Sequence, residues 1–136
     1  MAVADGSDPK VTRCADDASV LDAERLVLRA PARFGTRALP AATLVGTVRL
    51  RCSRRCAAAW AKLIPAPVIY HPELGTVTVV AERPADGTTT RFHLGHLEQA
   101  YGDLLLTGLG CVIAGGTITS STGQSISATT RCRGRP

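Results

Sequence analysis

Residues 43–52 read TLVGTVRLRC, and this stretch decides the predicted fold class. Its residues fall into two alternating sets: Leu44, Gly46, Val48, Leu50 and Cys52 on one side, and Val45, Thr47, Arg49 and Arg51 on the other. Successive side chains of a strand point to opposite faces, so a period of two is typical of a half-buried β-strand. We therefore predict a strand over residues 43–52 that buries one face and keeps its arginines in water.

Most of the remaining chain shows the same period. The other predicted strands are residues 25–30, 76–83, 88–94, 108–120 and 124–132. Turn-forming residues separate them: Pro31, Gly35 and Pro40 in a loop over residues 31–42, the sequence PADG at residues 84–87, and Thr122-Gly123. The last four of these strands are expected to form two β-hairpins.

One stretch departs from the period of two. In residues 53–63, SRRCAAAWAKL, the apolar residues follow a helical spacing of i, i+3, i+4 and i+7: Cys56, Ala59, Trp60 and Leu63. Ser53 is a suitable N-cap and Pro65 a stop signal. We predict a helix of two to three turns here that lays Trp60 on the sheet. Residues 97–106 are a weaker candidate for a helical turn, because they contain Gly102.

The fold class that follows is mainly β: a small antiparallel barrel or sandwich of five or six strands, with one short α-helix at its edge. A chain of 136 residues fits a single domain. We place this domain at residues 9–132, between a flexible N-terminal arm over residues 1–8 and a flexible tail over residues 133–136.

Composition narrows the classes of function. Sixteen basic residues against eleven acidic ones give a net charge of +5, which permits association with polyanions without requiring it. Aromatic residues make up only 4 %, which disfavours nucleic-acid binding by base stacking. No stretch approaches the ~18 apolar residues that a membrane-spanning helix needs, and the first fifteen residues lack the apolar run of a signal peptide.

Five cysteines are a dense set for a reducing cytosol and an ordinary one for an exported domain. Because five is odd, at most two disulfides form, and spacing alone leaves their pairing open. A zinc site built from Cys52, Cys56 and a histidine lacks a matching second cysteine pair. A catalytic thiol at Cys56 lacks a supporting base, so structural disulfides are favoured and no metal or cofactor is expected.

Three histidines were weighed as catalytic or metal-binding residues: His71, His93 and His96. They lie in predicted loops or at strand ends, where such residues are usually satisfied surface groups. No serine stands in a nucleophile elbow, and the glycine-rich stretches lack the lysine of a phosphate-binding loop. We therefore expect no catalytic constellation.

The order of four elements resembles a bacterial family of domains of unknown function. The elements are Asp5-Gly6-Ser7-Asp8-Pro9, then Cys14 with Asp17-Ala18, then Arg49-Leu50-Arg51, then the SRRCAAAWAKL stretch at residues 53–63. In that family, a DxDP…C…DA opening leads to an LRYSxxC turn and an AWA segment. The resemblance implies a small β-rich, extracytoplasmic domain, in some members behind a transmembrane segment and a helix-turn-helix regulator. It implies no activity.

The resemblance also suggests that Cys14 pairs with Cys56. The chain departs from the family at Cys52, where an aromatic residue is usual, and this unsettles the assignment because Cys52 lies four residues from Cys56. A second disulfide between Cys111 and Cys132 would close the last hairpin. By loop entropy alone, the two would stabilise the fold by about 4 and about 3 kcal/mol.

The arginines carry the binding hypothesis. Arg49 and Arg51 share a strand face, and Arg54 and Arg55 begin the predicted helix, so these four are the candidate anion-binding residues. We predict a non-enzymatic, extracytoplasmic binding module that recognises an anionic polymer or a protein partner through this face. The alternatives are a cytosolic small-barrel protein that binds nucleic acid and an accessory component of a secreted assembly.

Overall fold

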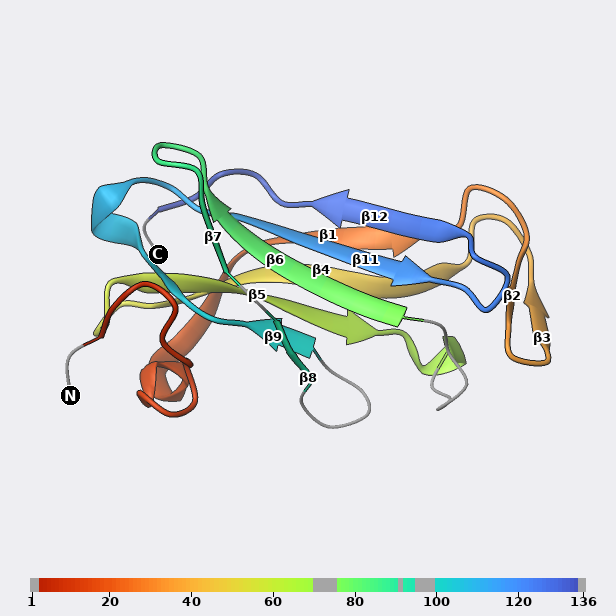
Figure 1. Cartoon of the computed structure of the whole chain (residues 1–136). Helices are drawn as coiled ribbons and strands as arrows, with labels where there is room; N and C mark the ends of the chain where they lie inside the picture. The colour runs from red at the N-terminus through yellow and green to blue at the C-terminus, as the bar shows by residue number, and fades with distance from the viewer. Residues whose placement is uncertain (1–2, 70–75, 91, 95–99, 135–136) are drawn as a thin grey trace.

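Two antiparallel sheets stack on each other in the computed structural model, which describes residues 3–69, 76–90, 92–94 and 100–134 (Figure 1). The first sheet has the strand order β1-β4-β5-β9-β8, with β10 also paired to β5. Its strands are β1 (Ala18–Val27), β4 (Leu44–Ser53), β5 (Ala58–Pro65), β8 (Phe92–Leu94), β9 (Ala100–Gly102) and β10 (Leu105–Leu106). The second sheet has the order β12-β11-β6-β7 and consists of β6 (Thr76–Arg83), β7 (Thr88–Thr90), β11 (Ile113–Thr119) and β12 (Ser125–Thr129).

Shorter elements lie outside the two sheets. A separate hairpin, formed by β2 (Ala32–Phe34) and β3 (Arg37–Leu39), projects at the end of the molecule opposite the N-terminal segment (Figure 1). The 3-10 turns are η1 (Cys14–Asp17), η2 (Pro67–Ile69) and η3 (Thr107–Leu109).

The core lies between the two sheets, where β11 packs over β4 and β5. Gly116 of β11 shows how closely they approach. A Cβ atom there would lie 3.1 Å from the Cβ of Val48 and 3.2 Å from the Cδ1 of Leu63. Even an alanine methyl group at this position would require Val48 and Leu63 to shift by a few tenths of an ångström. The mainly β, antiparallel fold is confirmed, and of the two expected architectures the sandwich is the one observed.

The strands predicted from alternation are present in part. β1 covers residues 18–27 instead of 25–30, β11 begins at Ile113 instead of residue 108, and the predicted strand over residues 88–94 is divided between β7 and β8, which belong to different sheets. β4 pairs with β1 on one side and β5 on the other, and its inward residues Val48, Leu50 and Cys52 are all buried. β6 has the predicted bounds, and the turn after it leads into β7. β11 and β12 form the second predicted hairpin. The sheets contain more strands than the five or six expected, because several are only two or three residues long.

The predicted helix over residues 53–63 is wrong. These residues form the end of β4, a turn at residues 54–57 in which Ala57 has φ 49°, and the first part of β5. Both faces of β5 are covered. Ala59 and Leu63 face the second sheet, while Trp60, 2 % exposed, faces the N-terminal segment. A strand buried on both faces gives a continuous apolar run whose spacing does not distinguish it from a helix.

Two further corrections concern connections. The predicted loop over residues 31–42 contains the β2–β3 hairpin. Of the helical turn predicted over residues 97–106, residues 97–99 lie outside the described residues, and the rest contains strands β9 and β10. Among the described residues, no helix is long and apolar enough to cross a membrane.

Two disulfides fasten the ends of the chain. Cys14 is bonded to Cys56 and Cys111 to Cys132, while Cys52 is free and buried. The Cys14 disulfide ties the N-terminal segment to the β4–β5 turn, beside a second apolar cluster that includes Ala58, Trp60 and Leu104. The segment over residues 5–8 is also held by backbone hydrogen bonds, from Gly6 N–H to the Leu104 carbonyl and from Leu104 N–H to the Ser7 carbonyl.

Candidate anion-binding face

Three cations lie side by side on the outer face of the first sheet. In the β4–β5 register, Arg49 lies opposite Lys62, and Arg51 lies opposite Trp60. Directly opposed residues of an antiparallel pair share one face, and residues two apart along a strand do so as well. Arg49, Arg51 and Lys62 therefore form one group, and each of them is half-buried. We call these three residues the cationic face.

A fourth cation reaches this group from the N-terminal segment. The Lys10 ammonium lies 4.6 Å from the centroid of the Tyr101 ring, and Tyr101 is opposite Lys62 in the β5–β9 register. The Tyr101 hydroxyl donates to Asp8, at 3.2 Å from Oδ2. Burial, followed by the nearby Asp8 carboxylate, raises the pKa of Tyr101. The Tyr101 hydroxyl therefore stays protonated. Asp8 is an acidic residue at the edge of the cationic face.

The surroundings of the cationic face disfavour the charged forms of its side chains. Burial, and then the charge of Arg49, lowers the pKa of Arg51. Burial, and then Arg51, Lys10 and Arg49, lowers the pKa of Lys62. Within the described residues, none of these cations takes part in an ion pair. Burial and like charges both disfavour the ionised forms of these residues, and a bound anion would offset that cost by supplying an opposite charge.

The N-terminal segment decides which part of the sheet stays open. Pro9 and Cys14 are buried, and the segment covers Trp60, leaving the residues farther along β4 and β5 to the solvent. At the β4–β5 turn, the Ser53 hydroxyl donates to Asp17 at 2.6 Å, and the Arg55 N–H donates to the other oxygen of Asp17 at 3.0 Å. These hydrogen bonds lower the pKa of Asp17 and keep it ionised.

Of the four arginines proposed from the sequence, Arg49 and Arg51 lie beside Lys62 in the structure. Arg54 and Arg55 lie in the exposed β4–β5 turn, where the Arg55 guanidinium donates to the Arg13 carbonyl. Neither is among the cations that lower the pKa of Lys62. The sequence analysis missed Lys62 because it placed this residue in a helix. As a strand, AAWAKLIP puts Trp60, Lys62 and Ile64 on one face.

In the described part of the chain, the cysteines and histidines considered for catalysis or metal binding form no such site. Cys56 is held in a disulfide, and the Sγ of the buried Cys52 lies 3.3 Å from the Ser19 hydroxyl. His71 and His96 lie outside the described residues, and for His93 only the backbone is described, in β8. Among the described residues, no group of three or more metal-ligating side chains comes together.

A family model matches residues 2–102, and its description is "Protein of unknown function (DUF2690)". The chain belongs to this family. The DUF2690 match includes Lys10, Arg49, Arg51 and Lys62, so the whole cationic face lies inside the family domain. The motifs and the domain arrangement implied by the resemblance stay predictions. No curated protein matches the chain, and no solved structure matches it either.

Proposed function

We propose that this domain is a non-enzymatic binding module that acts outside the cytoplasm and holds an anionic polymer against its cationic face. The observation that carries the proposal is the grouping of Arg49, Arg51 and Lys62, half-buried and without ion pairs among the described residues. Burying charge without a partner costs stability, so a ligand that supplies the missing charge gains the difference on binding.

The two disulfides support the proposed location. Disulfides persist in oxidising compartments and are rare in the cytosol, where thiols are kept reduced. Polymers of a cell envelope that carry phosphate or carboxylate groups at regular spacing would supply such anions. Arginine binds such groups with two parallel N–H donors, and Lys62 adds a point charge beside them.

Nucleic acid fits the face less well. Proteins that bind single strands stack bases on exposed aromatic rings. Here Trp60 is 2 % exposed, and the ring of Tyr101 already carries the Lys10 ammonium. The exposed aromatic surface near the cations is therefore small.

The test is titration of the protein with linear polyphosphate over a series of salt concentrations. We expect binding that weakens with salt, with a slope of log K against log salt of about −2 for three contacts. The triple variant Arg49→Gln/Arg51→Gln/Lys62→Gln is expected to lose binding by at least about tenfold. A matched control with the same change in charge, Arg33→Gln/Arg54→Gln/Arg131→Gln, keeps most of it.

Equal loss in the two triple variants would show that net charge alone drives binding, and the proposed site would be wrong. Tighter binding of duplex DNA than of polyphosphate at the same salt would favour the nucleic-acid alternative. Hydrolysis of the polyphosphate during the titration would contradict the non-enzymatic part of the proposal.

A further inference from the structure

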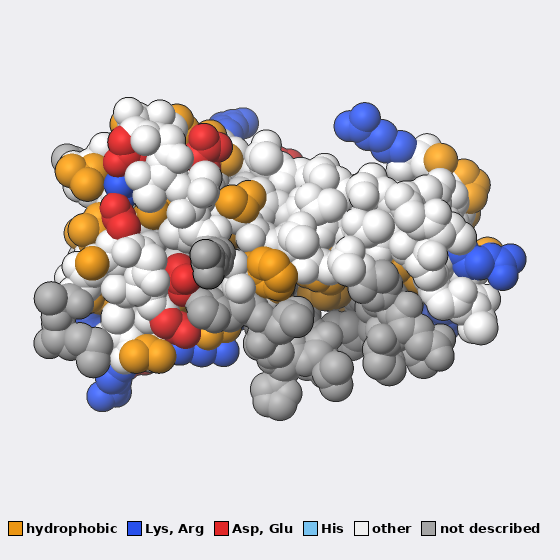
Figure 2. Space-filling model, in the orientation of Figure 1, with side chains coloured by type: hydrophobic (Ala, Val, Ile, Leu, Met, Phe, Trp, Pro, Cys, Tyr) orange, Lys and Arg blue, Asp and Glu red, His pale blue; other side chains and the backbone are white. Residues whose placement is uncertain are grey.

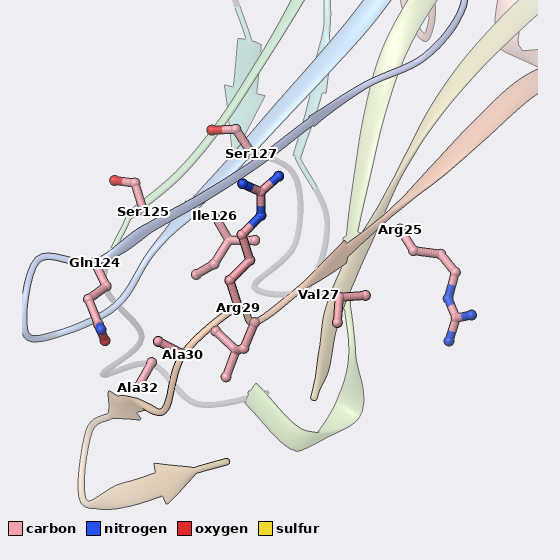
Figure 3. Close-up of a pocket in the computed structure, with 10 residues that line it drawn as sticks. Arg25, Val27, Arg29, Ala30, Ala32, Gln124, Ser125, Ile126 and Ser127 are labelled. Atoms are coloured by element: carbon pink, nitrogen blue, oxygen red, sulfur yellow. The ribbon is translucent and has the colours of Figure 1, made fainter. Parts of the chain in front are cut away.

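A groove runs between the edges of the two sheets, and its lining includes none of the three residues of the cationic face. It lies between β1 and β12, has a volume of about 670 Å³, and is open along one side (Figure 3). Its lining mixes polar and apolar side chains and includes Val27 from β1 and Ile126 from β12. Both strands are sheet edges: in the described part of the chain, β1 pairs only with β4, and β12 only with β11.

The groove is closed at both ends by hydrogen bonds. At one end, the Gln124 side-chain amide donates to the Pro31 carbonyl at 3.2 Å. At the other end, the Arg131 N–H donates to Asp22 at 2.8 Å. Between these two points, no hydrogen bond among the described residues joins β1 to β12. In the described part of the chain, the β12 edge that lines the groove is therefore unpaired at Ser125 and Ser127.

The register shows which backbone groups face the groove. Flanking hydrogen bonds run from Thr130 N–H to the Ala114 carbonyl and from Ser120 N–H to the Gln124 carbonyl. Because bonded and non-bonded pairs alternate in an antiparallel ladder, the even-numbered residues of β12 bond to β11. The N–H and C=O groups of Ser125, Ser127 and Thr129 consequently point away from β11, along the free edge.

This edge lacks the usual protection against strand pairing. Natural edges are blocked by charged residues, proline or bulges. The sequence of β12, SISAT, contains neither charge nor proline, and its pairing with β11 is regular over all five residues. Such an edge is a template for a further strand.

The positive charge beside β12 favours an acidic partner. Arg29 is exposed and forms no ion pair among the described residues. Figure 3 shows its side chain extending along β12 toward Ser127, whereas Arg25 points away from β12. A second copy of this chain would bring two Arg29 side chains and two net charges of +5 toward each other. An acidic segment would be attracted instead.

We propose that β12 is a strand-addition site for an extended acidic segment of a partner protein. The segment pairs with the outward backbone groups of Ser125 and Ser127, sets an apolar side chain against Ile126, and places a carboxylate by Arg29. Main-chain hydrogen bonds supply the affinity, and Arg29 supplies the selectivity for acidic sequence. This site does not depend on the cationic face.

The test uses a short fluorescent peptide that alternates valine and glutamate, followed by fluorescence anisotropy. A peptide that alternates valine and lysine is the charge control. We expect only the acidic peptide to bind. Methylating its backbone nitrogens on one edge should weaken binding by about tenfold or more, whereas methylation on the other edge should leave it unchanged, because only one edge meets β12.

Protein variants locate the site. Ser127→Pro removes an N–H that is not used in the β11 ladder, and we expect it to weaken peptide binding by about tenfold, whereas Ser127→Ala leaves binding intact. Arg29→Glu is expected to weaken binding of the acidic peptide and to keep the fold, so the proposal stays testable even if the proline variant does not fold. The triple variant of the cationic face should bind the peptide normally.

Three results would overturn the proposal. The first is equal binding of the acidic and basic peptides. The second is insensitivity to Arg29→Glu and to N-methylation of either edge. The third is a dimer in solution that Ser127→Pro converts to a monomer, which would make a second copy the true occupant. If the cationic-face variant alone abolished peptide binding, the peptide would be a ligand of that face and not of β12.

Discussion

Two regions of the molecule bury basic side chains at least partly. Acidic partners surround the basic side chain in one region, and other cations surround it in the second. Arg83, 1 % exposed, meets Asp5 through two hydrogen bonds of 2.9 and 2.7 Å, and also reaches Asp86 and the Leu106 carbonyl. Its partners raise the pKa of Arg83 above the ordinary value. On the cationic face, burial and then the charges of neighbouring cations lower the pKa values of Arg51 and Lys62.

The difference in pairing indicates that Arg83 has a structural role and that the cations of β4 and β5 are available for binding. Every donor direction of the Arg83 guanidinium is used inside the fold, so this cation has nothing left to offer a ligand. Figure 2 shows acidic side chains gathered at the end of the molecule that carries the N-terminal segment, where Asp5 and Asp86 lie. The cations of β4 and β5 keep their donors available, at a cost in stability, because no described acidic residue forms an ion pair with them.

The N-terminal segment serves both regions, because it supplies Asp5 to Arg83 and Lys10 to the margin of the cationic face. The largest effect is therefore expected from Cys14→Ser/Cys56→Ser, which frees this segment from the β4–β5 turn. We expect the free energy of unfolding to fall by about 4 kcal/mol in urea titrations. Polyphosphate binding should weaken as well.

The matched control is Cys111→Ser/Cys132→Ser. Loss of this disulfide should destabilise the chain by about 3 kcal/mol and leave polyphosphate binding of the folded protein unchanged. If both double variants lost binding equally at a temperature where each is folded, the special role of the N-terminal segment would be disproved.

Arg83→Met tests the paired cation. The change removes the centre of a buried ion-pair network, and we expect the free energy of unfolding to fall by about 3 kcal/mol. Arg54→Met, at an exposed position, should change it by less than about 0.5 kcal/mol. Thermal and urea unfolding measure both, and polyphosphate binding by folded Arg83→Met should equal that of the wild type. Unaltered stability in Arg83→Met would show that the network contributes nothing.

Lys62→Met tests the unpaired cations. Because Lys62 is repelled by its neighbours, its removal should stabilise the protein by a few tenths of a kcal/mol, and this gain should shrink at high salt as the repulsion is screened. Urea titrations at low and high salt measure the effect. A destabilised variant would mean that Lys62 has a favourable partner in the fold, which would contradict the comparison with Arg83.

The sequence predicts the strands well where one face of the sheet is buried and the other is wet. β4 and β6 have this pattern, and their positions were predicted closely. β5 was missed because Trp60 and Ala58 are covered by the N-terminal segment, so the strand has no polar face at that end. Long-range packing of this kind leaves no local signal.

The same limit applies to the cationic face. Arg49 and Arg51 were identified because they alternate within one strand. Lys62 and Lys10 join them through strand register and through a segment that is fixed by the Cys14–Cys56 disulfide, and neither is visible in local spacing. The outward backbone groups of β12 likewise follow only from the hydrogen-bond register.

The central claim is that the cations of β4 and β5 are kept for an external anion. The most direct test is an NMR titration of the Lys62 ammonium group with and without polyphosphate, because the ligand should reverse what burial and Arg51 do to this residue. We predict that the pKa of Lys62 is below the ordinary lysine value in the free protein and rises when polyphosphate binds. A pKa that stays unchanged under saturating polyphosphate would contradict the account.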